Sequence, residues 1–201
     1  MGKVAAFPLA MPVLVLLLSA VGLLRTKLPR PVGQREVAIP DFRPVGLPLL
    51  FLLMVVILRS FVGMSLSFPW KGEGQWTLIL IFMLAAGKAA GGYLADSFGF
   101  IRTAVVSLAL STVLLFLSDL PVFGVAAILL FNMTMPLTLW ASARLLPHVR
   151  GFAFGLLTFG LFLGFLPVAF GAKMISGEMA AGLAVVSLLL LLPGLGKAVE
   201  R

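Results

Sequence analysis

The stretch GKAAGGYLADSFGFIRT, residues 87–103, joins two long apolar runs and combines small residues, an acid and a base at the end of a hydrophobic segment. On a helix, Lys88, Gly92 and Asp96 are four residues apart and share one face. Glycines let a neighbouring helix approach closely, and Asp96 and Arg102 stand where the chain leaves hydrocarbon for water. The sequence therefore predicts a hinge-like turn between two membrane helices.

The composition is that of an integral membrane protein. Hydrophobic residues make up 61% of the 201 residues, 11% are charged, and the mean hydropathy is +1.17, which is far from the balance of soluble domains. The net charge of +8 does not indicate nucleic-acid binding, because the bases are scattered between apolar runs without interleaved aromatics. The sequence has no cysteine, which excludes disulfides and thiolate metal sites.

Seven apolar segments are long enough to cross a bilayer, which takes about 20 residues for roughly 30 Å of hydrocarbon. They cover residues 4–24, 46–67, 77–95, 103–118, 121–143, 151–171 and 178–193. The fourth and the last are the shortest and therefore the weakest. All are expected to be helices, because lipid cannot satisfy backbone polar groups. The predicted fold is an all-α integral membrane protein with about seven transmembrane helices.

Residues 25–45, between the first two spans, are predicted to form a cytoplasmic linker. The stretch from Arg25 to Pro44 contains five basic residues and four prolines, which indicates an extended chain. Alternation of the spans then places ten of the fifteen Lys and Arg residues inside, with Lys3, Lys71 and Lys173 outside. We therefore expect an external N-terminus and a cytoplasmic C-terminus, in the plasma (inner) membrane.

Residues 92–99, GYLADSFG, resemble the loop signature of the major facilitator superfamily. The signature's glycine, leucine, alanine, aspartate and second glycine match at Gly92, Leu94, Ala95, Asp96 and Gly99. Ser97, Phe100 and Ile101 replace basic residues of the signature, and Arg102 is the base that remains, one place late. The resemblance implies a gating motif of Gly92, Asp96, Gly99 and Arg102. The alternative interpretation is an ordinary tight cytoplasmic turn.

The resemblance also implies a domain organisation. Members of this family have two six-helix halves joined by a long cytoplasmic linker, and the motif follows the second helix of each half. Asp96 follows the second span after the linker, so residues 1–24 resemble the last helix of an N-terminal half, and residues 46–201 resemble a six-helix C-terminal half. The stretch PHVRGFAFGL, residues 147–156, resembles the start of the family's eleventh helix.

Three polar residues lie deep inside predicted spans, where a charge is costly and usually faces a cavity or a partner. Arg59 lies about 20 Å from the cytoplasmic end of its span, and Lys88 and Asn132 lie near mid-depth. We expect a pathway for substrate or coupling ion there, since such transporters place their sites at the midplane. Alternatively, Arg59 snorkels outward or caps a carbonyl, Lys88 pairs with an acid, and Asn132 joins helices. Two central cations without an acid indicate either an anionic substrate or missing partners.

The remaining polar residues predict no catalytic or metal site. No acid pair, metal cluster or nucleophile–base set lies within the predicted spans, which argues against an enzyme and against a cofactor. Trp70, Trp76 and Trp140 lie near span ends, as interfacial anchors do. Gly160 and Gly164 have the spacing of a helix-packing motif.

Two functions remain open from the sequence. One is transport of a small solute by alternating access, either with a separate N-terminal half or as a homodimer in the bilayer. In a homodimer, Asp96 of one chain would face Arg150 of the other, instead of pairing locally with Arg102. The other function is a non-transporting membrane subunit, a scaffold or the truncated remnant of a transporter.

Overall fold

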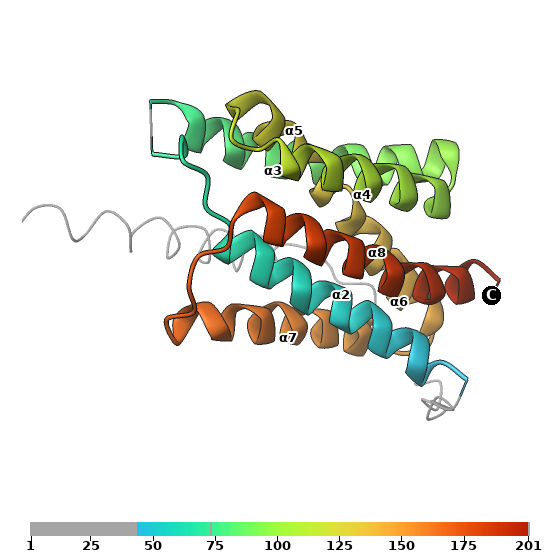
Figure 1. Ribbon diagram of the computed structural model, residues 1–201. Coiled ribbons are helices and arrows are strands. Elements are labelled where there is room, and N and C mark those ends of the chain that lie inside the picture. The colour runs from blue at the N-terminus through green and yellow to red at the C-terminus, as the bar shows by residue number, and fades with distance from the viewer. Residues whose placement is uncertain (1–43, 73, 201) are drawn as a thin grey trace, which may run out of the picture. The chain divides into compact units, whose positions relative to one another are not determined.

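The computed structural model describes residues 44–72 and 74–200, and this part of the chain is all-helical, with no strand (Figure 1). The predicted first span, residues 4–24, and nearly all of the predicted linker, residues 25–45, lie outside the described residues. Six of the seven predicted spans lie within them. The prediction of an all-helical protein with several apolar helices long enough to cross a membrane is confirmed.

The described helices follow the predicted spans closely. They are α2 (Gly46–Ser65), α3 (Trp76–Phe98), α4 (Phe100–Phe116), α5 (Pro121–Asn132), α6 (Thr134–Leu145), α7 (Arg150–Ala169) and α8 (Gly177–Val199). The α5 and α6 helices together form one span of 25 residues. Five spans in the described part are long and apolar enough to cross a membrane, and α4, with 17 residues, is shorter.

The predicted end of the last span at residue 193 is wrong. The α8 helix continues through Pro193 to Val199 and has 23 residues. A proline removes one backbone hydrogen bond from a helix, but α8 is held beyond it by packing. Gly194 lies against α2, where an added β-carbon would be 2.9 Å from Leu52 Cγ. The last span is therefore long enough to cross the membrane.

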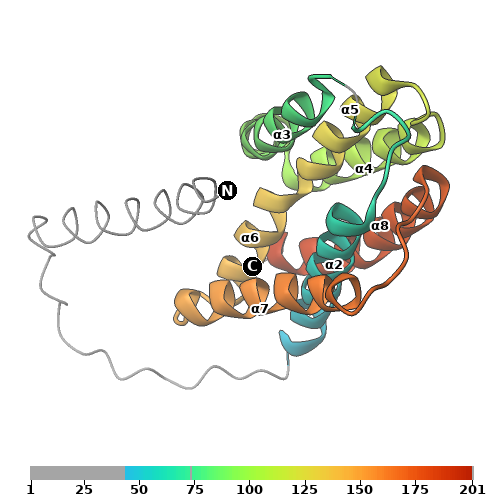
Figure 2. The same ribbon diagram turned by 90° about the vertical axis from the view of Figure 1, so that its left-hand side faces the viewer.

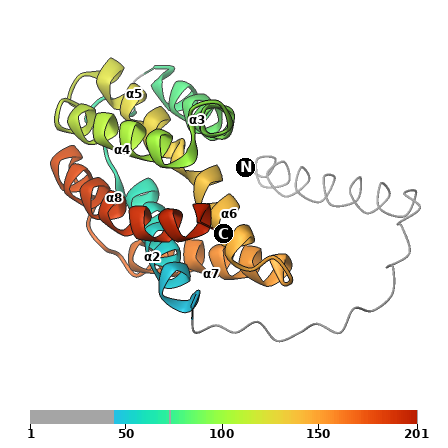
Figure 3. The same cartoon turned by 90° about the vertical axis from the view of Figure 1, so that its right-hand side faces the viewer.

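The helices form two groups that pack together along α4 and α8 and share the α5–α6 span. The first group contains α3, α4 and α5, and the second contains α2, α7 and α8; α4 packs along α8 between them (Figures 2 and 3). The α6 helix continues from α5 toward α2, α7 and α8, and contacts all three. The α5–α6 span therefore runs from one group into the other, and its middle lies inside the bundle.

Glycines bring two helix pairs into close contact, as the sequence predicts. A β-carbon added at Gly91 of α3 would lie 2.5 Å from Met133 Cα, and one added at Gly87 would be 3.1 Å from Leu129 C. Gly164 of α7 lies equally close to α2, where an added β-carbon would be 2.6 Å from Ser60 Cβ. Without side chains at these positions, the backbones approach closely enough for dispersion contacts to hold the helices together.

The end of the bundle opposite Gly99 is closed by Trp70, and the prediction that this residue is an interfacial anchor is wrong. Its side chain is only 4% exposed, and its Nε1 donates a hydrogen bond to the Ser118 carbonyl at 2.9 Å. Its ring stacks on Phe68, with centroids 4.8 Å apart. The indole fits because it lies against Gly124, where no side chain competes for the space.

Candidate functional site

The α5–α6 span is interrupted at Met133, in the middle of its length. Pro136 has no amide hydrogen for the carbonyl of Asn132, one turn earlier. At the same place, Met133 donates its amide hydrogen to the Leu130 carbonyl, three residues earlier, at 3.1 Å. A bond over three residues makes this turn tighter than an α-helical turn. This interruption leaves carbonyl groups in mid-span that need other donors.

Arg59 of α2 provides donors at this interruption. The side chain is 6% exposed, and its Nη2 donates to the Phe131 carbonyl at 2.8 Å while Nη1 donates to Thr134 Oγ1. Thr134 Oγ1 also donates to the same carbonyl, at 3.0 Å. The Arg59 guanidinium lies 5.2 Å from the centre of the Phe131 ring, within cation–π range. Arg59 therefore caps a carbonyl, which is one of the alternatives the sequence left open, and it joins α2 to the interrupted span.

Asn132 lies on the side of the interruption that contacts α3. It is 8% exposed, and its Nδ2 donates to the Ile128 carbonyl of its own helix at 2.8 Å. Its Cβ would be 3.1 Å from a β-carbon added at Gly87. Asn132 thus contacts α3 by packing, and its amide hydrogen bond stays within α5.

Lys88 is the neighbour of Gly87 and lies about 18 Å along α3 from Trp76, near mid-helix. Its side chain is half-buried. Within residues 44–72 and 74–200 it has no ion pair, since the single pair found there joins Lys197 and Glu200 at 3.0 Å. Neither Lys88 nor Arg59 therefore has an acidic partner in this part of the chain, and Arg59 differs in being hydrogen-bonded to neutral groups.

The structure thus places the three predicted pathway residues, Arg59, Lys88 and Asn132, at the level of one interrupted helix. Sequence reasoning missed Thr134 and Thr138 of α6, which are both 1% exposed. Their sequence signal is the spacing of four between them, which puts two hydroxyls on one helical face.

A small cavity adjoins this site between α2, α6 and α7. Its volume is about 70 Å³, and its polar lining comes from Arg59, Thr138 and Thr158 among apolar side chains. This volume holds a few water molecules and is well below the roughly 300 Å³ of a typical ligand pocket. In this conformation the site is closed around its own side chains.

The four residues of the predicted gating motif extend from the last two turns of α3 through Gly99 to the first turn of α4. Gly99 is the one residue between the helices and has φ of 94°, a conformation that favours glycine. The predicted turn between two apolar helices is confirmed. Gly92 lies near Pro136, with 3.8 Å between an added β-carbon and Pro136 Cβ. Asp96 and Arg102 are both exposed and form no ion pair with each other.

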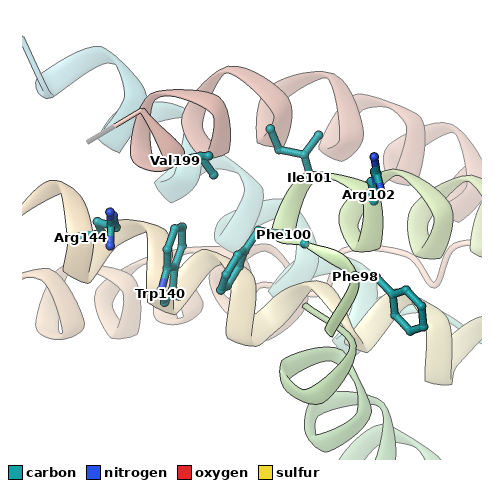
Figure 4. Close-up of a pocket in the computed structure, with 8 residues that line it drawn as sticks. Phe98, Phe100, Ile101, Arg102, Trp140, Arg144 and Val199 are labelled. Atoms are coloured by element: carbon teal, nitrogen blue, oxygen red, sulfur yellow. The ribbon is translucent and has the colours of Figure 1, made fainter. Parts of the chain in front are cut away.

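This turn also borders a cavity of about 490 Å³ that faces α6 and the end of α8. Figure 4 shows Phe100 and Trp140 stacked in its centre, with ring centroids 3.8 Å apart. Arg144 lies beside Trp140, and Arg102 lies on α4 beyond Phe100. The two arginines therefore stand apart, on different sides of the aromatic pair.

Comparison with known proteins provides no relative for this arrangement. No protein-family model matches the chain, and no similar protein was found among curated proteins or solved structures.

Proposed function

We propose that this chain is the C-terminal half of a secondary transporter of the major facilitator type, which moves a small solute by alternating access. The observation that carries the proposal is the group of polar residues around the mid-span interruption of α5–α6. Interrupted helices with polar side chains near the bilayer midplane are typical of the substrate and ion sites of secondary transporters. The loop signature at Gly92, Asp96 and Gly99 favours the same family.

Within this proposal the mid-depth residues have different roles. Arg59 is already bonded to Phe131 and Thr134, so it maintains the interruption. Lys88 has no ion pair among the described residues, and is the residue that is free to attract an anionic substrate or a coupling partner. Transport assays on Lys88 therefore test function, whereas substitution of Arg59 also disturbs the fold.

Lys88→Ala is expected to abolish uptake while leaving the folded protein intact, because no described residue forms an ion pair with the ammonium group. The full chain would be reconstituted into proteoliposomes and tested with a panel of radiolabelled organic acids, phosphate esters and neutral solutes. Lys173→Ala, which removes an exposed lysine from the α7–α8 connection, is the matched control and should transport normally.

Two outcomes would count against this role. Normal uptake by Lys88→Ala would remove Lys88 from the pathway. Failure of the folded wild-type chain to transport any solute in the panel, with or without a co-expressed N-terminal half, would favour the other function, a non-transporting subunit or scaffold.

A functional homodimer would provide the second half from another copy of the chain. Asp96 and Arg150 are both exposed and form no ion pair within the described residues, so each is available to a partner. Because the chain has no cysteine, Asp96→Cys and Arg150→Cys together should form an oxidised dimer in membranes. Each single substitution is the control, since an Asp96–Arg150 contact requires both cysteines. Equal cross-linking by a single variant, or none in an actively transporting preparation, would contradict this dimer.

A further inference from the structure

A cavity lies at the connection between α6 and α7, at the same end of the bundle as the α3–α4 turn. Its volume is about 650 Å³, within the range of ligand sites. Trp140 and Arg144 line both this cavity and the cavity of about 490 Å³ beside the α3–α4 turn. A larger part of its surface is polar than in that neighbouring cavity. Its charged lining residues are Arg144 and Arg150, and its other lining residues are Trp140, Ala143 and Pro147.

The connection between α6 and α7 is short and tightly held, so it fixes where the two arginines lie. Leu146 donates its amide hydrogen to the Ser142 carbonyl at 3.1 Å, and Val149 donates to the Leu146 carbonyl at 3.2 Å. The Leu146 side chain is 1% exposed, which anchors the connection in the apolar core. Arg144 lies in the last turn of α6, and Arg150 is the first residue of α7. One tight turn therefore brings two cations to the same cavity.

Contacts within the chain account for the position of Arg144 but not for that of Arg150. The Arg144 guanidinium lies 5.4 Å from the centre of the Trp140 ring (Figure 4), within cation–π range, and a cation is favourable near the carboxyl end of a helix. Arg150 stands at the amino end of α7, where the helix dipole makes a cation unfavourable. The first turn of α7 has no acid to offset this charge. An anion in the cavity would compensate it.

Acidic residues in the described part of the chain do not neutralise the two arginines. The single ion pair found there joins Lys197 and Glu200. Both arginines are exposed, at the end of the bundle that the Lys and Arg distribution predicts to be cytoplasmic. An anion can therefore reach them from the water or from the membrane surface. Arg102 is exposed at the same end, but it lines the neighbouring cavity and not this one.

We propose that this cavity binds a phosphate monoester, whose phosphate oxygens accept hydrogen bonds from Arg144 and Arg150. The planar guanidinium group donates paired hydrogen bonds that match phosphate oxygens. A phosphate monoester carries close to two negative charges at neutral pH, which suits two arginines. The same group occurs in soluble phosphate esters and in the headgroup of phosphatidic acid. The site does not depend on transport activity, and in a homodimer the phosphate would compete with Asp96 of the other copy for Arg150.

Protection of arginines from phenylglyoxal, which modifies exposed guanidinium groups, tests this site in the full chain in neutral detergent. Peptide mass spectrometry gives the modification rate of each arginine with glycerol 3-phosphate or dioleoyl phosphatidic acid, at constant ionic strength. At about ten times the dissociation constant, where about 90% of sites are occupied, the rates at Arg144 and Arg150 should fall about tenfold. Arg102 should react at its unprotected rate. Protection by glycerol 3-phosphate identifies a soluble ligand, and protection by phosphatidic acid alone identifies a lipid headgroup.

Substitutions test whether the two arginines form one site. Arg150→Gln should raise the concentration of the protecting phosphate compound that half-protects Arg144 about tenfold, because one charged hydrogen-bond donor is lost. Arg150→Lys keeps the charge but not the paired donors, and should raise it about threefold. Arg102→Gln is the matched control and should leave the protection of Arg144 unchanged, because Arg102 does not line this cavity.

Three results would each overturn the proposed phosphate site. Equal protection of Arg102 would mean diffuse surface charge at this end of the bundle. Unchanged protection of Arg144 in Arg150→Gln would mean that the two arginines act independently. A lack of protection by both glycerol 3-phosphate and phosphatidic acid would mean that the arginines are only solvated.

Discussion

Gly91→Ala is expected to destabilise the bundle by about 3 kcal/mol, the upper end of the usual cost of overpacking. The added methyl group would lie 2.5 Å from Met133 Cα and would overlap the Met133 carbonyl oxygen. Both atoms belong to the backbone, so a change of side-chain rotamer cannot relieve the clash, and α3 must move away from α5. Reversible unfolding of the purified protein by a denaturing detergent, followed by circular dichroism, measures the change in free energy of unfolding.

Gly92→Ala is the matched control for this prediction. It changes the next residue of the same helix, where the added β-carbon would be 3.8 Å from Pro136 Cβ, an ordinary van der Waals distance. Alanine is also the better helix former, by about 1 kcal/mol. Gly92→Ala should therefore be neutral or stabilising. Equal destabilisation by both substitutions would show that general sensitivity of α3, and not the close contact at Gly91, limits stability.

Thr134→Val is expected to lower the free energy of unfolding by about 2 kcal/mol, in the range measured for buried groups left unsatisfied. Valine has the shape of threonine, so packing is retained. The buried Arg59 guanidinium loses an acceptor, and the Phe131 carbonyl loses one of its two side-chain donors. Because the guanidinium is charged and 6% exposed, bulk water does not reach it, and a replacement acceptor has to come from the cavity of about 70 Å³ beside it. The same unfolding assay measures this change.

Thr138→Val is the control for Thr134→Val, because Thr138 is equally buried and lies one turn further along α6. Its hydroxyl donates to the Met135 carbonyl of its own helix, at 2.7 Å, and Arg59 forms no hydrogen bond with it. We expect a loss of about 0.5 kcal/mol, the low end for a neutral hydrogen bond. If the two valine substitutions cost the same, the contact between Arg59 and Thr134 contributes nothing specific to stability.

The sequence features that predict a membrane protein also predict where the helices of the described part begin and end. Apolar length and the need to satisfy backbone polar groups are local properties of a segment, so the limits of α2, α3 and α7 agree closely with the predicted spans. The predicted end of the last span at residue 193 was wrong, because α8 continues through Pro193. A proline inside a helix is tolerated when tertiary packing holds the following turn, as it does at Gly194.

The sequence identified three of the residues of the candidate site, but it did not identify the groups that they contact. Depth along a span identified Arg59, Lys88 and Asn132 as unusual, because charged and polar groups are rare near the centre of a bilayer. However, depth along a span does not identify a partner. By depth alone, Arg59 and Lys88 were equally good candidates for the pathway. The structure separates them by hydrogen bonding. Neither has an ion pair among the described residues, but the Arg59 guanidinium is hydrogen-bonded at the helix interruption.

The sequence by itself determined the membrane class, the apolar spans, the turn at Gly99 and the glycines that pack helices closely. Each of these follows from residues that are neighbours along the chain or share one helical face. Only the tertiary structure decided which groups meet. Arg59 and Thr134 are 75 positions apart, and Trp70 reaches a carbonyl 48 positions away. Such contacts depend on how whole helices pack, and hydrophobic burial, which drives that packing, has no direction that would specify a partner.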